Sequence, residues 1–406
     1  MESFLLDQIP EEIKNTWLFY SVILFVGLVG YFIREFGQLL ATATLKHFKR
    51  ALGSWSRLRL AIDAIDVDGP GLWISRKPRR PNNYASNIKN SIPIILVANL
   101  KGGVGKTTIA ANLIAHYTQK KNQRILAIDL DFQGSLSSMI IPGDSFDELL
   151  AQQANGEDSK AAQLIEGKTA RWLASVAERV GSHLKGAKCI PSYYSLAAAE
   201  NRVMIKWLIA ERTDDVRYSL ASVLHDRKTQ LAYDKIILDA PPRLTTATIQ
   251  GLCAATHVLI PTRLDSLSSD AVGTFIDQLC IGQEIWPELK LLGIVGNATA
   301  ESPQKDHNGQ FIDRLYRLEA EVTRSLQDIV EAALERGKAP LRQTRHDFVF
   351  APTSFIPNKR EISRAAGKRI VYSSIQESES AHVVRDEIIP AFDRLGDEID
   401  SRLEQK

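Results

Sequence analysis

A glycine-rich loop that carries two lysines and two threonines is the part of this sequence best suited to chemistry. It reads NLKGGVGKTT over residues 99–108, follows an apolar run at 92–98 and precedes a helical pattern. In such a strand–loop–helix unit, glycines let backbone N–H groups turn inward around a polyphosphate, and the helix dipole adds attraction. Lys106 would reach the β- and γ-phosphates, and the Thr107 hydroxyl would bind Mg²⁺. The residues expected to line this phosphate site are Gly102, Gly103, Val104, Gly105, Lys106, Thr107 and Thr108.

Carboxylates close two further apolar runs. Asp129 and Asp131 lie in the sequence DLDFQG at 129–134, where the run at 124–130 ends, and Asp239 closes the run at 233–239. In phosphoryl transfer the protein contributes mainly orientation and charge stabilisation. Acids placed here could therefore orient an attacking water or hold a metal ion. Asp129 could equally cap the end of its strand.

The glycine loop departs from the ordinary P-loop pattern, which has a glycine five residues before Gly105, where this chain has Leu100. The sequence KGGVGKT that begins at Lys101 resembles the deviant Walker A box of the ParA/MinD family of P-loop ATPases, KGGxGK followed by Ser or Thr. The segment at 129–134 resembles the DxDxQG box of ParA-type partition ATPases rather than the MinD version. The resemblance covers roughly residues 92–372. A tight glycine turn with incidental lysines is the alternative interpretation of the loop.

The resemblance implies a role for each matching residue. In this family the first lysine of the box reaches across a nucleotide-sandwich dimer to the partner's ATP, and Lys101 matches it. Asp131 matches the aspartate that positions the attacking water, and Asp239 matches the Walker B carboxylate that holds Mg²⁺ through water. The resemblance thus implies ATP and Mg²⁺ as cofactors, with Lys101, Lys106 and Asp131 catalytic and with Thr107 and Asp239 at the metal. It also implies a homodimer on ATP binding, a ParB-like activating protein and contact with nonspecific DNA.

The resemblance extends to the base site. Asn297 directly follows the apolar run at 291–296, where relatives place a side-chain amide on adenine, and a capping role is the alternative. Pro357 lies in the segment 355–368, FIPNKREISRAAGK, which is similar to the stretch that closes the nucleotide pocket of ParA proteins. One segment departs from the family. After Pro241 and Pro242 the chain continues with Arg243-Leu-Thr-Thr, whereas the family usually has Ser and Gly-rich residues. The contact through which a partner would stimulate hydrolysis is therefore left open.

The order of the elements predicts the fold class. Apolar runs alternate with helical patterns, and the phosphate loop follows the first run. This order favours an α/β fold with a doubly wound, mostly parallel sheet of P-loop NTPase type, whose ligand lies at the carboxyl ends of the strands. We expect this ATPase domain to span residues 91–406, with 136–232 and 301–350 divergent or inserted. An amphipathic helix through Phe311–Leu326 and a C-terminal helix within 381–406, packed on the core, complete it.

Composition excludes several classes of protein. The chain has 406 residues, 44% of them hydrophobic, which rules out a wholly disordered chain. Lys and Arg number 50 against 48 Asp and Glu, so no global charge excess points to a protein that coats nucleic acid. The three cysteines, Cys189, Cys253 and Cys280, form no CxxC pair, which argues against a disulfide scaffold, a zinc module or an iron–sulfur site.

A membrane anchor is expected near the N-terminus. Residues 16–33 contain no charge, and eighteen helical residues extend about 27 Å, close to the thickness of a hydrocarbon core. A cleaved signal peptide is the first alternative, but the preceding tail has four acids against Lys14, the wrong sign for a signal peptide. A buried core helix is the second alternative. We therefore expect a transmembrane helix at 16–33.

The charges that flank this helix predict its orientation. Residues 34–90 contain eleven Lys or Arg and four acids, so the positive-inside rule places the large C-terminal part of the chain in the cytoplasm. The expected arrangement is a single-pass protein of the bacterial inner membrane, with a short outer tail at 1–15. A basic juxtamembrane segment and linker would occupy 34–90. Within it, Pro78 and Pro81 predict an extended stretch at 75–81, which is either a solvated tether or an arm that contacts DNA.

Two functions are consistent with this combination. The first is a membrane-anchored ParA-like ATPase whose Mg-ATP-dependent dimerisation and slow, partner-stimulated hydrolysis position or partition DNA or another cargo. The second is a membrane-bound MinD-like regulatory ATPase that organises an envelope, secretion or defence complex without binding DNA. A tyrosine kinase that joins membrane helices to a related P-loop domain is disfavoured, because no tyrosine follows Tyr372.

Overall fold

The structure is a computed structural model that forms two compact units, residues 1–63 and 64–406. It describes residues 71–209, 215–299, 313–336, 342–343, 347–362 and 381–404, with isolated helical positions between 20 and 59. The predicted tail at 1–15 and most of the predicted span at 16–33 lie outside the described residues. Within the described part, none of the helices has the length and apolar content that a membrane crossing requires.

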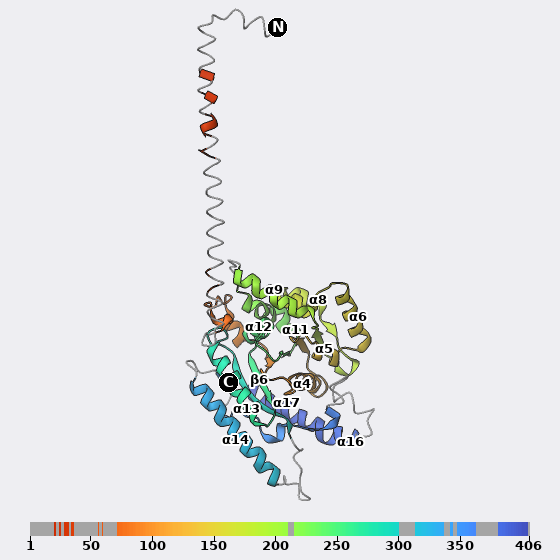
Figure 1. The fold of residues 1–406 in the computed structure, drawn as a ribbon. Coiled ribbons are helices and arrows are strands. Elements are labelled where there is room, and N and C mark those ends of the chain that lie inside the picture. Colours follow the sequence, from red (N-terminus) through yellow and green to blue (C-terminus); the bar gives the residue numbers. More distant parts are fainter. Residues whose placement is uncertain are drawn as a thin grey trace, which may run out of the picture. The chain divides into compact units, whose positions relative to one another are not determined.

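A mostly parallel sheet forms the centre of the larger unit (Figure 1). Its strand order is β3-β4-β2-β5-β1-β6-β7-β8, and β9 pairs with β7. Only the β3–β4 pair is antiparallel among the described strands. This order confirms the expected α/β P-loop class. The strands are β1 Ile94–Val97, β2 Ile125–Asp129, β3 Glu178–Arg179, β4 Ala187–Ile190, β5 Lys235–Asp239, β6 His257–Thr262, β7 Lys290–Thr299, β8 Arg342–Gln343 and β9 Ile356–Pro357.

Helices connect the strands and cover both faces of the sheet (Figure 1). The α-helices are α3 Tyr84–Lys89, α4 Lys106–Gln119, α5 Ser135–Ile140, α6 Gly143–Ala154, α7 Lys160–Ile165, α8 Ala170–Val176, α9 Ser195–Ile209, α10 Ser219–Leu224, α11 Arg227–Ala232, α12 Thr246–Ala254, α13 Ser266–Ile281, α14 Asp313–Arg336, α16 Ala381–Val383 and α17 Ile389–Glu404. The 3-10 helices are η1 Leu72–Ile74, η2 Ser182–Leu184, η3 Val216–Tyr218 and η4 Pro352–Ser354. The segment η6 Val384–Ile388 is a π-helix.

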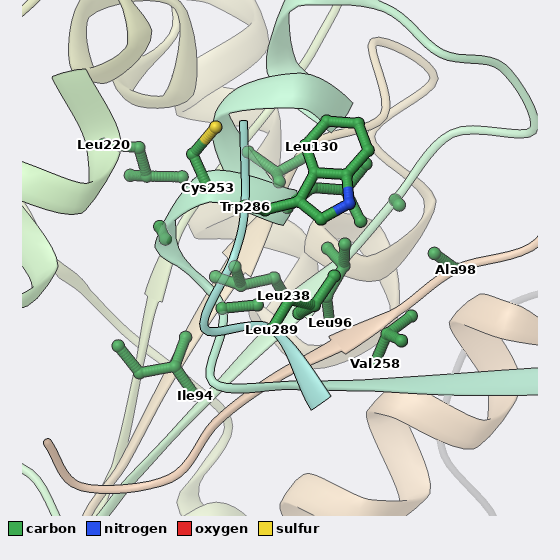
Figure 2. Close-up of a cluster of buried hydrophobic side chains, with 14 of the residues drawn as sticks. Ile94, Leu96, Ala98, Leu130, Leu220, Leu238, Cys253, Val258, Trp286 and Leu289 are labelled. Carbon is green, nitrogen blue, oxygen red and sulfur yellow. The ribbon is translucent and has the colours of Figure 1, made fainter. Parts of the chain in front are cut away.

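Two hydrophobic cores hold these layers together, one on each face of the sheet. Alternate residues of β1 divide between them, because successive side chains of a strand point to opposite faces. Ile94 and Leu96 face the core under α7, α9, α10, α12 and α13, whereas Ile95 and Val97 face the core under α4, α5 and α17. Figure 2 shows part of the first core, where Leu96 lies among Leu238, Val258 and other labelled side chains. Burial on both faces explains why these strands read as continuous apolar runs in the sequence.

The predicted secondary structure agrees with the structure within a few residues. The run at 92–98 contains β1, and the run at 233–239 contains β5. The amphipathic helix expected through Phe311–Leu326 corresponds to α14, which starts at Asp313 and extends to Arg336. The C-terminal helix packs on the core as predicted, because Ile388, Phe392 and Leu395 are buried in the second core.

The segment 72–80, here called the strap, packs against the domain rather than forming a solvated tether. As expected, 75–81 contains no helix or strand. However, Trp73 stacks on Trp207 of α9 with ring centroids 5.0 Å apart, and Arg76 donates to the Leu208 carbonyl at 2.7 Å. The fully buried Arg217 pairs with Asp215 at 2.6 Å and donates to the Trp73 carbonyl. The prolines predicted the extended backbone, whereas these tryptophan and arginine contacts hold it in place. Residues 72–80 therefore pack against the rest of the larger unit.

Candidate nucleotide-binding site

The glycine loop lies at the carboxyl end of β1, between its neighbours β5 and β6. This is the position where open α/β sheets bind their ligands. Gly103 and Gly105 have φ angles of 72° and 88°, a left-handed backbone that glycine adopts at little cost. Helix α4 begins at Lys106, so its N-terminal N–H groups follow the loop directly. The structure therefore places the predicted phosphate-binding residues in the expected strand–loop–helix unit.

Asn297 supports this loop from β7. Its amide nitrogen donates to the Val104 carbonyl at 2.9 Å, and the residue is buried. A Cβ atom at Gly105 would lie 2.0 Å from that nitrogen, so the close approach requires glycine. The structure thus gives the Asn297 side chain a supporting role in the loop. Its contact with an adenine remains a prediction.

The side chain of Lys106 is held over the loop by a backbone carbonyl of the loop. Its Nζ donates to the Lys101 carbonyl at 3.0 Å, and the residue is buried. Burial lowers the pKa of Lys106, while the nearby carboxylates of Asp239 and Asp131 partly raise it. An ammonium already removed from most water interacts strongly with an incoming phosphate, as the predicted role requires.

Lys101 points to a different part of the same chain. Its Nζ donates to Ser268 Oγ at 2.8 Å and to Asp265 Oδ1 at 3.3 Å. Asp265 is the N-cap of α13, because its carboxylate accepts the Ser268 N–H at 2.8 Å. We call this contact the resting contact of Lys101. The structure therefore shows the lysine bound within one chain, and its expected reach to a partner remains a prediction.

Two buried acids, Asp129 and Asp239, lie side by side at the ends of β2 and β5, where they are register partners. Burial raises the pKa of Asp129 to about 7. Asp129 is nevertheless fully engaged, since it accepts from the backbone N–H and hydroxyl of Ser137 at 2.9 and 2.7 Å and from the Asp131 N–H at 3.1 Å. It therefore positions the loop that carries Asp131. From the sequence alone, Asp129 could either take part in the chemistry or cap the end of its strand, and these hydrogen bonds give it the capping role.

Asp239 differs from Asp129 because neither of its carboxylate oxygens accepts a well-formed hydrogen bond among the described residues. Burial and the Asp129 carboxylate raise its pKa well above the usual range, although the adjacent Thr107 hydroxyl and Lys106 oppose this. Buried oxygens without partners require an explanation. Asp239 and Thr107 would supply oxygen ligands, which a hard cation such as Mg²⁺ prefers.

The oxygen atoms of Thr107 and Asp239 suit a metal that is shared with a ligand. Among the described residues, no group of three or more His, Cys, Asp and Glu side chains could hold a metal ion. Mg²⁺ is usually bound by one or two protein oxygens together with substrate phosphates and water. Thr107 and Asp239 are thus suited to Mg²⁺ that arrives with a nucleotide.

Asp131 lies in a tight loop next to this site. Its Oδ1 accepts the Gln133 N–H at 3.0 Å, and its charge acts on Lys106. Gly134 follows with φ of 66°, and a Cβ there would lie 2.4 Å from the Ser192 carbonyl. The glycine of the DxDxQG box is therefore required by a close backbone approach. The fold brings Asp131, Lys106 and Asp239 together from three separate segments.

The short strand β9 brings Pro357 next to the end of β7, one residue after the partner of Asn297. In the parallel pairing of β7 with β9, Asn297 pairs with Ile356 and Thr299 pairs with Pro357. The segment predicted to close the pocket thus runs next to the residue predicted to meet the base. Contact of Pro357 with a nucleotide remains a prediction.

Sequence reasoning missed two polar residues of this site. Asn99, buried at the start of the loop, donates to the Pro261 carbonyl at 2.8 Å and accepts the Lys101 N–H at 3.0 Å. It thereby ties β1 to β6 below the loop. Glu200 of α9 is buried, and its carboxylate accepts the Ala247 N–H at 3.0 Å, which fixes the start of α12. The sequence signal that could have indicated a buried Glu200 is its position on the apolar side of the helical pattern of α9.

Comparisons with known proteins agree with this geometry. Residues 92–289 match the family described as AAA domain. The Chromosome-partitioning ATPase Soj of Thermus thermophilus is 30% identical over 204 residues, which cover 50% of this chain and 67% of that protein. The Chromosome partitioning protein ParA of Myxococcus xanthus is 29% identical over 209 residues, which cover 50% of this chain and 63% of that protein. The solved structure of pNOB8 ParA shares the fold, with a TM-score of 0.50, 20% identity, and coverage of 77% of this chain and 99% of that one.

Proposed function

Because this chain belongs to the ParA/Soj family of P-loop ATPases, we propose that it is a membrane-anchored switch driven by Mg-ATP. It binds Mg-ATP, dimerises around it, and hydrolyses it slowly to position or partition DNA or another cargo. The observation that carries the proposal is the buried Asp239 carboxylate, which accepts no well-formed hydrogen bond among the described residues and lies near Thr107 and the buried Lys106. The chain covers only 63% of the length of the Myxococcus relative, so its cargo, partners and hydrolysis cycle are part of the proposal.

Binding uses the parts already assembled around the loop. The backbone N–H groups near Gly103 and Gly105 surround the phosphates, and the Lys106 ammonium faces the β- and γ-phosphates. Thr107 and Asp239 would hold Mg²⁺, which would neutralise phosphate charge when bound. Lys106 must leave the Lys101 carbonyl to contact a phosphate, and this exchanges a neutral acceptor for a charged one.

Hydrolysis then depends on Asp131. Its loop is fixed by the Asp129 carboxylate and by Gly134, so its side chain can orient a water for in-line attack. The transition state is loose and spreads charge over the phosphoryl oxygens, so orientation and charge stabilisation provide most of the rate. With these groups alone the expected rate is slow, and a ParB-like partner would increase it.

Lys101 would link the two subunits of the dimer by contacting the partner's ATP. This lysine must leave its resting contact with Asp265 and Ser268 to reach the ATP of a partner subunit. The same ATP then bridges two copies of the chain, so nucleotide hydrolysis separates them. ATP thereby acts as a switch between two association states.

The anchor would confine this switch to the inner membrane, with the ATPase unit in the cytoplasm. The uncharged run at 16–33 and the basic excess at 34–90 support this part of the proposal. Carbonate extraction of membranes and protease protection of an N-terminal tag test it. Recovery of the chain in the extracted supernatant, or cleavage of the tag only from the cytoplasmic side, would contradict it.

A MinD-like regulatory role is the second candidate, because a spanning helix would prevent the chain from diffusing over a nucleoid. The two functions differ in DNA binding. We expect the full-length chain to bind nonspecific duplex DNA only with ATP and Mg²⁺, and to lose affinity steeply as salt increases. If nucleotide binding and dimerisation occur without any such DNA binding, the regulatory function is favoured.

A further inference from the structure

The turn after β5, residues 240–245, carries an arginine that no part of the proposed mechanism uses. Arg243 stands where the sequence departs from the family pattern. The backbone of this turn is well fixed, because the Arg243 carbonyl accepts the Thr245 N–H at 3.0 Å and the Thr248 hydroxyl at 2.7 Å. Since Asp239 ends β5, the turn begins directly after the residue proposed to hold Mg²⁺.

The Arg243 side chain contacts the loop that carries Asp131. Its guanidinium carbon lies 5.8 Å from the centre of the Phe132 ring, within the range of a cation–π contact. Phe132 directly follows Asp131 and packs against the first hydrophobic core. The contact therefore links the turn after β5 to the loop after β2.

A buried acid, Glu200, lies next to the same turn. Burial raises the pKa of Glu200, and the positive charge of Arg243 opposes this rise while the negative charge of Asp131 adds to it. Glu200 also holds the first turn of α12 through the Ala247 N–H. Arg243 and Asp131 thus both lie within electrostatic reach of Glu200, beside the proposed site of hydrolysis.

We propose that Arg243 is a positioning residue for hydrolysis, which acts by holding Phe132, and hence Asp131, against the turn that follows Asp239. This inference rests on the proposed ATPase function. An exposed arginine in contact with one aromatic ring restrains its loop weakly, so its effect on the rate is moderate. The chain thereby supplies internally part of the orientation that other systems obtain from a partner.

Steady-state hydrolysis by the full-length chain, together with the affinity for a non-hydrolysable ATP analogue, tests the proposal. We expect Arg243→Ala to lower kcat about 2- to 5-fold, the change in rate that loss of an exposed cation–π contact would give, with unchanged nucleotide affinity. Phe132→Leu, which removes the ring and keeps an apolar side chain, has the same effect. Arg243→Lys, which keeps the charge near Glu200, retains more activity than Arg243→Ala. Arg171→Ala, at an exposed arginine of α8, is the matched control and leaves kcat unchanged.

The double variant shows whether Arg243 acts through Phe132. If it does, Arg243→Ala combined with Phe132→Leu lowers kcat no further than either change alone. Two independent effects that multiply would overturn the proposal, as would an unchanged kcat in Arg243→Ala. A fall in nucleotide affinity as large as the fall in kcat would also overturn it. Failure of the proposed function itself looks different, because the unmodified chain would then neither bind nor hydrolyse ATP.

Discussion

Replacement of Asp265 by Asn should strengthen ATP-dependent dimerisation, because it removes the acid that holds Lys101 in its resting contact. The Lys101 and Asp265 side chains are 31% and 47% exposed and lie 3.3 Å apart. An exposed ion pair of this kind contributes about 0.2–1 kcal/mol. A symmetric dimer must release two such lysines, so the resting contacts oppose dimerisation by about 0.4–2 kcal/mol in total. Their removal should lower the dimer dissociation constant roughly 2- to 30-fold.

Asn is the suitable replacement because its side-chain oxygen can still accept the Ser268 N–H and cap α13. Sedimentation equilibrium of the full-length chain with Mg²⁺ and a non-hydrolysable ATP analogue measures the effect. Lys101→Ala should bind nucleotide as a monomer and fail to dimerise, and Asp265→Asn should have no effect in that background. The gain should also shrink as salt increases, because exposed charges are screened.

Two results would refute this reasoning. If Asp265→Asn weakens dimerisation, Asp265 contributes to the dimer and does not compete with it. If Lys101→Ala dimerises as well as the unmodified chain, Lys101 does not reach the partner's ATP, and the competition does not exist.

Three further predictions concern the phosphate loop, the hydrolysis step and the pH dependence of stability. Gly105→Ala should abolish nucleotide binding in a titration, because its Cβ would lie 2.0 Å from Asn297 at a φ of 88°; binding at unmodified affinity would contradict the close approach. Asp131→Ala should reduce ATP turnover and accumulate ATP-bound dimers, and unchanged turnover would remove Asp131 from the mechanism. The contribution of His225 to the free energy of unfolding should fall, by up to about 3 kcal/mol, as pH decreases from about 6.5 to 4. The cause is that burial lowers the pKa of His225 to about 4, so the folded state resists the proton that the unfolded state accepts. Urea unfolding across this pH range should show that the stability of the unmodified chain decreases relative to that of His225→Gln as pH falls, and a constant difference between the two would exclude His225 as a cause.

Much of the fold could be predicted because its signals are local in the sequence. Strands buried on both faces read as apolar runs, and a phosphate loop must have glycines where the backbone turns and a lysine at a fixed distance. The Asp131 loop was found for the same reason, since its acid, glutamine and glycine lie within six residues.

Contacts between distant segments could not be predicted in this way. Lys101 and Asp265 are separated by 164 positions, and no spacing rule links them. The strap was interpreted from its prolines, whereas its position depends on Trp207 and Arg217, which lie more than 130 residues further along the chain. Glu200 was missed because a single acid in a helical pattern is usually exposed. The Asn297 amide was expected to contact the adenine base of a nucleotide. Only the fold shows that its nitrogen donates to the Val104 carbonyl.

Nucleotide binding by the full-length chain tests the central claim most directly. Calorimetric titration with Mg²⁺ and a non-hydrolysable ATP analogue should show one nucleotide per chain. Lys106→Ala should bind about 10- to 150-fold more weakly, as expected for loss of a hydrogen bond to a charged group. A folded chain that binds no nucleotide, or that binds it equally well without the Lys106 ammonium, would contradict the account.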